Sequence, residues 1–321
     1  MKKVVYLLTL PLCILLLIQC RSMDEDNSAI IEEDKILDMV PSGSGLAIWK
    51  DSLYIVSDDA PFIYRLSLKD FSYEQFPLKG YTNAAYRIPK NIKPDFESAA
   101  IGEMGGQQYL FAFGSGSKTP GRDSLLIVNT ANLQEQKTMS LSGLYIGLRE
   151  KTNTPSAQWN LEGIAITHDT LLLFNRGNNM VVEIEWVEFT RYIATGGDIP
   201  YLRHYTLNLP THDGHLARVS GACELNDHGD ILFCASIEDT PNWYTDGPVI
   251  GSYIGIYNRR TKALSRAHLL LGDLRQPLKE KVESIEFLKA DDDGVHVIVV
   301  ADNDKGQSRL MKILLKGKTK G

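Results

Sequence analysis

One short phrase recurs five times along the chain, and this repeat constrains the fold more than any other feature of the sequence. Each copy has Ser or Glu, then Gly or Ser, and then an apolar segment with the character of a strand. A repeat of this length indicates an architecture that uses one structural unit again and again. The copies begin at Ser44, Glu97, Glu162, Ser220 and Glu283.

Further strand-like runs follow each copy after a turn rich in Gly, Asp or Asn. They are dense in β-branched and aromatic residues, which favour strands. The second runs are 53–56, 109–113, 171–174, 231–234 and 296–300. The third runs are 62–66, 125–128, 181–186, 253–257 and 310–315.

These repeats predict an all-β chain folded as a β-propeller with five blades, since four strands per repeat make a propeller blade. The intervals between copies are long enough to conceal a sixth blade. We find no amphipathic helix in the pattern. The last repeat ends near residue 315 with three strands, so the strand-like segment 35–40 is expected to close the last blade. A β-sandwich and an open repeat array are the alternatives.

The N-terminus has the layout of a secretory signal over residues 1–19, with Lys2 and Lys3 followed by a short apolar run. The run is too short to cross a bilayer as a helix. Residues 17–20 resemble the lipobox of bacterial lipoproteins, which implies acylation of Cys20, a membrane lipid as partner and a place in the cell envelope, at the outer membrane, in the periplasm or at the surface. A later signal cut or an uncleaved anchor are the alternatives.

The rest of the chain divides into an acidic tether over 20–34, the propeller over 35–316 and a basic tail over 317–321. Loss of the two signal lysines would take the formal net charge from −6 to −8, which disfavours nucleic acid as a partner. We expect a monomer. Cys223 and Cys234 lie symmetrically about the turn at 227–230, so they could form a cross-strand disulfide or remain as two buried thiols.

Acidic residues are expected to gather on one face of the propeller. The first strand of a blade starts beside the end of the second strand, because the two are antiparallel. Carboxylate oxygens without His or Cys suit calcium better than zinc. The alternative is that these carboxylates bind backbone amides of the next blade. The expected calcium ligands are Glu97, Glu162 and Glu283 at the repeat starts, with Asp58 and Asp302 at strand ends.

A glycine-rich loop over 114–122 could bind an anion on the same face. Flexible glycines let backbone amides converge, and basic side chains supply charge. We expect Lys118 and Arg122 of the loop to act with Arg176 of the next repeat. An ordinary mobile loop is the alternative.

The segments 160–166 and 95–101 resemble the inner-strand motif of phytase-like propellers, the group named for the esterase-like activity of phytase. Likeness to gluconolactonase and regucalcin propellers is more distant, and the whole chain is similar to an uncharacterised family of bacterial propeller lipoproteins. In the gluconolactonase group a Glu-Gly motif helps to hold a divalent ion, and Glu162 matches it. Ser57 and Asp58 are followed by Asp59, which departs from the Ser-Asp-Gly motif of that group.

Two functions follow from these patterns. The first is a calcium-dependent hydrolase that acts on a small anionic ester or phosphoester. The second is a non-enzymatic propeller that binds a glycan, a peptide or a protein partner at the envelope. A structure in which the glutamates at the repeat starts are fully engaged by groups of the propeller itself would favour the non-enzymatic function.

Overall fold

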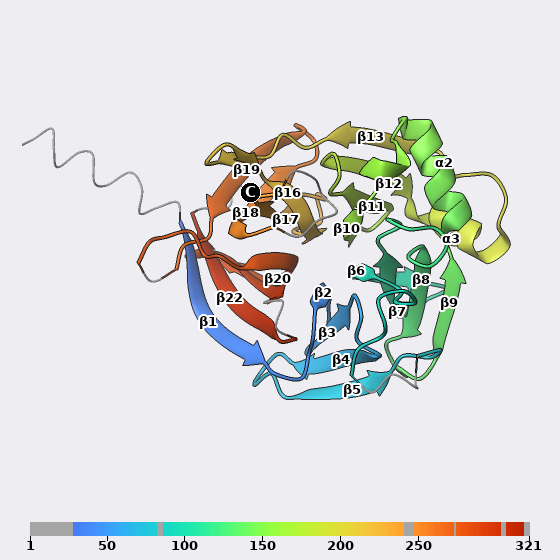
Figure 1. Ribbon diagram of the computed structural model, residues 1–321, viewed down its shortest axis with the longest axis horizontal. Coiled ribbons are helices and arrows are strands. Elements are labelled where there is room, and N and C mark those ends of the chain that lie inside the picture. The colour runs from blue at the N-terminus through green and yellow to red at the C-terminus, as the bar shows by residue number, and fades with distance from the viewer. Residues whose placement is uncertain (1–27, 82–85, 241–246, 273, 303–305, 318–321) are drawn as a thin grey trace, which may run out of the picture.

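The computed structural model describes residues 28–81, 86–240, 247–272, 274–302 and 306–317. Its strands form five four-stranded antiparallel sheets arranged as blades around a central axis (Figure 1). The chain is therefore a five-bladed β-propeller, as the repeats predicted. The signal, Cys20 and most of the expected tether lie outside the described residues, as does most of the basic tail. No described helix is long and apolar enough to cross a membrane.

Each blade runs from an inner strand at the axis to an outer strand at the rim. Blade 1 contains β2 (Gly43–Trp49), β3 (Ser52–Ser57), β4 (Phe62–Ser67) and β5 (Tyr73–Pro77). Blade 2 contains β6 (Phe96–Met104), β7 (Gln107–Gly114), β8 (Ser124–Asn129) and β9 (Gln136–Ser140). Blade 3 contains β10 (Leu161–Ile166), β11 (Thr170–Asn175), β12 (Met180–Glu185) and β13 (Leu202–Thr206). Blade 4 contains β16 (Arg218–Glu224), β17 (Ile231–Glu238), β18 (Val249–Asn258) and β19 (Ala263–Leu269), and blade 5 contains β20 (Lys281–Asp291), β21 (Gly294–Asp302), β22 (Ser308–Lys316) and β1 (Ala29–Leu37). A small hairpin, β14 (Thr211–His212) and β15 (His215–Leu216), lies between blades 3 and 4.

The N-terminal strand closes the ring. Strand β1 is the outer strand of blade 5 and pairs with the C-terminal strand β22, from Ala29 opposite Leu315 to Leu37 opposite Ser308 (Figure 1). The closure was expected, but β1 starts at Ala29 instead of near Lys35, so the end of the expected tether belongs to the blade. Ala29 and Ile31 pack against the apolar core between blades 4 and 5. The acidic composition of the segment gave no sign of this part of the strand in the sequence.

The apolar core divides into five clusters, one at each seam between neighbouring blades. The second residue of the repeated phrase is small because the inner strands approach closely there. A Cβ added to Gly45 would lie 2.7 Å from the backbone nitrogen of Ala99, and one added to Gly221 would lie 2.7 Å from the carbonyl oxygen of Glu283. The small residue thus brings the five repeat starts together around the axis.

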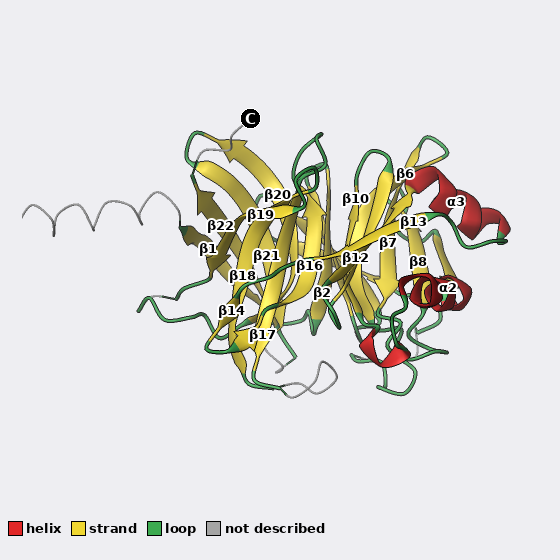
Figure 2. Ribbon diagram, turned by 90° about the horizontal axis from the view of Figure 1, so that it is seen from above, coloured by secondary structure: helices red, strands yellow, loops and turns green. Residues whose placement is uncertain are grey.

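Two helices were not anticipated from the sequence. They are α2 (Ser142–Thr152) and α3 (Trp186–Thr195), which lie at the outside of blades 2 and 3 (Figure 2). Helix α3 places Phe189 and Ile193 on one buried face, and the ring of Phe189 stacks on Phe113 with centroids 5.7 Å apart. These helices occupy part of the long intervals between repeats, and the described residues form no sixth four-stranded blade.

Candidate functional site

All five repeat starts are β-bulges. In blade 2, Phe96 pairs with Gly114 and Ser98 pairs with Phe113, so Glu97 is one residue in excess of its partner strand. A bulged residue is left out of the ladder, and its side chain is re-aimed. The same shift falls at the repeat start of every other blade, at Ser44, Glu162, Ser220 and Glu283.

A pocket of about 300 Å³ opens at the end of the propeller axis where the inner strands begin. It is lined by four of the five bulged residues and by residues that follow the second strands, including Asp58 and Asp302. The expectation that repeat starts and strand ends share one face is confirmed. The described lining consists of eight acidic residues, six basic residues, three serines and an asparagine, and has no aromatic or aliphatic residue.

On one side of the pocket, buried ion pairs link blades 3, 4 and 5. Arg176 is 4% exposed, and its guanidinium contacts Glu162 at 3.0 Å and Glu238 at 2.7 Å. The ammonium of Lys281 contacts Glu283 at 3.0 Å and lies 4.0 Å from Glu238. Burial raises the pKa of Glu283 to about 8, although Lys281 opposes the shift. Glu162 and Glu283 are therefore engaged with cations of the protein, not with each other.

On the opposite side, ion pairs link blades 1 and 2. Lys93 contacts Asp58 and lies 2.7 Å from Oδ1 of Asp95, which is 1% exposed. The guanidinium of Arg122 donates a hydrogen bond of 3.1 Å to Oδ2 of Asp95. Burial raises the pKa of Asp58 to about 6, against the attraction of Lys93. This side is organised around Asp95.

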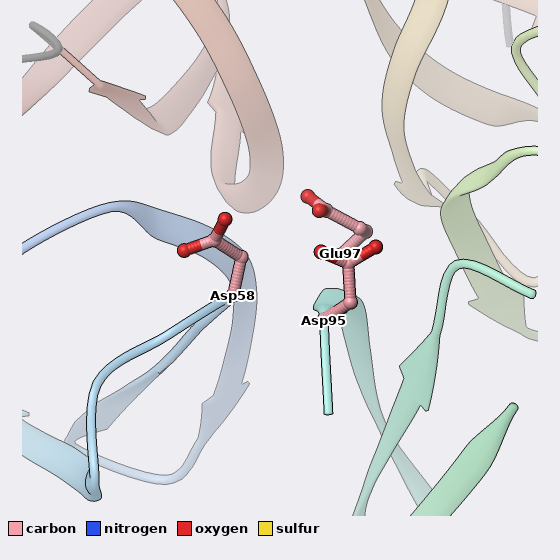
Figure 3. Close-up of side chains that lie close together, drawn as sticks. All are labelled: Asp58, Asp95 and Glu97. Carbon is pink, nitrogen blue, oxygen red and sulfur yellow. The ribbon is translucent and has the colours of Figure 1, made fainter. Parts of the chain in front are cut away.

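Glu97 differs from the other glutamates at repeat starts because it has no ion pair or hydrogen bond with any described residue. Its carboxylate comes together with Asp58 and Asp95, with one oxygen of each within 4.8 Å of the others (Figure 3). Burial, together with the negative charges of Asp95 and Asp58, raises the pKa of Glu97 well above its ordinary value. The protonated form of Glu97 therefore persists to a higher pH than that of an ordinary glutamic acid.

The expected anion site is assembled differently in the structure. Lys118 is exposed and does not line the pocket, whereas Arg122 and Arg176 line it within separate ion pairs. In the glycine-rich loop, the hydroxyl of Ser115 donates to Oδ2 of Asp95 at 2.6 Å. The structure therefore does not bring Lys118, Arg122 and Arg176 together around one point.

Several charged residues of the pocket were missed by the sequence analysis, and some of them had left a signal. The residue two positions before each repeat start is polar in every blade. Four of these five residues line the pocket: Ser42, Asp95, Asn160 and Lys281. Arg87, Lys90 and Lys93 come from the irregular connection between blades 1 and 2, where no repeat pattern marks them.

The two cysteines of the propeller are free thiols, so the disulfide considered from the sequence is not formed. Cys223 pairs with Leu232, and Cys234 pairs with Gly221. The strands are thus offset from the symmetric register that would place the cysteines opposite each other. Both side chains are buried in the core between blades 4 and 5.

The fold and the site together define a β-propeller with five blades and a charged pocket at one end of its axis. Within this class the chain belongs to a family of unknown function, DUF6929, whose model matches residues 39–315. No curated protein sequence matches the chain.

Solved structures of other propellers are similar to the chain in fold. The glutaminyl cyclase of Myxococcus xanthus is 11% identical with a TM-score of 0.48, and the match covers 91% of this chain and 98% of that protein. A mutant α-L-arabinanase of Cellvibrio cellulosa is 12% identical with a TM-score of 0.46, and the match covers 86% and 92%. Likeness at this level concerns the fold alone.

Proposed function

We propose that the axial pocket is the active site of a hydrolase that acts on a small, polar ester or phosphoester, with Glu97 as the proton donor. The observation that supports this role is the unpaired state of Glu97 in a pocket whose other glutamates at repeat starts are held by Arg176 and Lys281. Carboxyl groups whose environments move their pKa values apart are suited to acid and base roles.

The reaction requires a proton donor and a proton acceptor. Glu97 would give its proton to the leaving oxygen as the bond from that oxygen to the acyl or phosphoryl group breaks. Asp58, with a pKa of about 6, would accept a proton from the water whose oxygen forms the new bond. Lys93 keeps Asp58 ionised at neutral pH because it lowers the pKa that burial raises.

Calcium is a second candidate element of this site, because Asp58, Asp95 and Glu97 offer three carboxylate oxygens within 4.8 Å of one another. Oxygen ligands of this kind suit calcium, which would polarise a substrate carbonyl or phosphoryl oxygen. Lys93 contacts two of the three carboxylates, so an ion there would compete with its ammonium. The wider ligand set expected from the sequence has less support, since Glu162 and Glu283 are engaged in ion pairs.

We further propose that the protein is a lipoprotein of the cell envelope, anchored through Cys20. The basis is the sequence around that cysteine. Strand β1 begins at Ala29, so residues 21–28 would connect the lipid to the blade. A connection of this length reaches roughly 30 Å when extended, which would keep the propeller near the membrane surface.

A panel of small esters and phosphoesters tests the hydrolase, with Glu97→Gln compared to Glu103→Gln, an exposed residue of the same strand. Removal of a general acid costs about 10²–10⁴ in rate, so Glu97→Gln should lose turnover that Glu103→Gln keeps. Activity that disappears with a chelator and returns with calcium would favour a calcium ion as part of the active site. Ligand binding to the pocket without any turnover would contradict the hydrolase and favour the non-enzymatic function.

A further inference from the structure

The connection between blades 1 and 2 supplies three of the six basic residues of the pocket: Arg87, Lys90 and Lys93. A turn shapes this segment, because the carbonyl oxygen of Pro89 accepts hydrogen bonds from the amides of Ile92 at 2.9 Å and Lys93 at 3.0 Å. Arg122 of blade 2 lines the same side of the pocket and contacts Asp95, as Lys93 does. Four cations thus meet on this side.

These cations differ in how many of their N–H donors already bind acceptors of the protein. Lys93 is held between two aspartates. Lys90 is exposed at the pocket and has no acidic partner among the described residues. Arg87 uses Nε and Nη2 for Asp59 and Ser42, and Arg122 uses Nη1 for Asp95 and Ser117. Because a guanidinium has five N–H donors, both arginines keep donors beyond these contacts.

The cations of the pocket are concentrated on the side of blades 1 and 2. Four of the six cations of the pocket lie here, together with the carboxylates of Asp58, Asp59, Asp95 and Glu97 and with Asp302, whose charge acts on Arg87. On the opposite side, Arg176 and Lys281 face the three glutamates Glu162, Glu238 and Glu283. Cationic donors for an anionic group of a ligand are thus more numerous on the side of blades 1 and 2.

We propose that Lys90, Arg87 and Arg122 form an oxyanion subsite of the axial pocket, which binds a phosphate or carboxylate group of the substrate. The inference rests on the proposed function and narrows its substrate class to small molecules with such a group close to the bond that is cleaved. Arginine and lysine side chains bind oxyanions through charge-assisted hydrogen bonds. The unpaired donors lie at the same pocket as the unpaired acid Glu97, so one ligand could engage both.

Calorimetric titration with inorganic phosphate, and separately with acetate, tests the subsite in the folded protein. Lys90→Met should weaken binding about tenfold, the effect of losing one charge-assisted hydrogen bond, and Lys90→Arg should retain it. Lys118→Met is the matched control, since Lys118 is an exposed lysine of the same face that does not line the pocket. Preference for phosphate or for acetate tells which group the subsite accepts.

The subsite is refuted if neither anion binds the wild type at millimolar concentration, or if Lys118→Met weakens binding as much as Lys90→Met. The same titration on Glu97→Gln separates the two proposals. Phosphate or acetate binding that depends on Lys90 while no substrate is hydrolysed would support the subsite and contradict the hydrolase. Hydrolysis that depends on Glu97 while Lys90→Met changes neither anion binding nor KM would support the hydrolase and overturn the subsite.

Discussion

Replacement of Arg176 by Met should destabilise the propeller strongly. Arg176 is 4% exposed and joins blades 3 and 4 through Glu162 at 3.0 Å, Glu238 at 2.7 Å and the hydroxyl of Ser236 at 2.7 Å. Its loss leaves buried Glu162 without a cation and buried Glu238 with only Lys281 at 4.0 Å, and removal of one partner from a buried pair costs about 3–5 kcal/mol. For a chain of this size, such a loss lowers the melting temperature by roughly 6–10 °C.

Urea unfolding at pH 7 measures the change, with Arg203→Met as control. The side chain of Arg203 is 65% exposed and lies 3.4 Å from Glu183, and such surface pairs contribute at most about 1 kcal/mol. Addition of Glu162→Gln to Arg176→Met should cost less than the sum of the two single changes, because the neutral amide removes one uncompensated charge. A free energy of unfolding for Arg176→Met equal to that of the control would refute the inference that this ion-pair chain holds the blades together.

Three further predictions concern packing, pH and the thiols. Gly45→Ala should lower stability by more than about 1 kcal/mol, because an added Cβ would lie 2.6 Å from the side chain of Val56. Gly272→Ala should change stability little, because the nearest atom to its added Cβ lies at 3.8 Å. Equal unfolding curves for the two variants would contradict the close approach of the inner strands. Glu97 has a raised pKa in the folded state, so the folded protein binds the extra proton and loses stability as pH rises above about 4.5, and Glu97→Gln should flatten this dependence in unfolding curves at pH 5 and pH 8. In unreduced, denatured protein that starts at residue 28, thiol titration should find both Cys223 and Cys234, and a value near zero would show a disulfide.

The sequence predicted the blades well because each repeat start has a definite structural role. The phrase at Glu97 or Gly221 has to place a bulged residue at the axis and a small residue where inner strands meet. Because every blade has this requirement, the same residue pattern occurs five times in the sequence. The extent of β1 was less evident, since the outer strand of a blade is half exposed, and Glu32 and Glu33 resemble a solvated tether.

The partners of the site residues could not be read from the repeats. Arg176 and Glu238 belong to different blades, so their pairing depends on the packing of whole sheets. Lys93 lies in an irregular connection without any periodicity. For Cys223 and Cys234 the register was wrong, and a small shift in register changes which residues face each other across a pair of strands.

A pH titration of the carboxyl carbon of Glu97 tests the central claim most directly. Carbon-13 NMR of protein labelled at glutamate follows each carboxyl group, and the signal of Glu97 is the one missing from Glu97→Gln. The structure predicts that this group titrates with a midpoint well above 4.5, because it is partly buried beside Asp95 and Asp58, whose effect outweighs the opposing attraction of Lys93. A midpoint at or below 4.5 would show that Glu97 is ionised at neutral pH, and would contradict its role as the proton donor of the axial pocket.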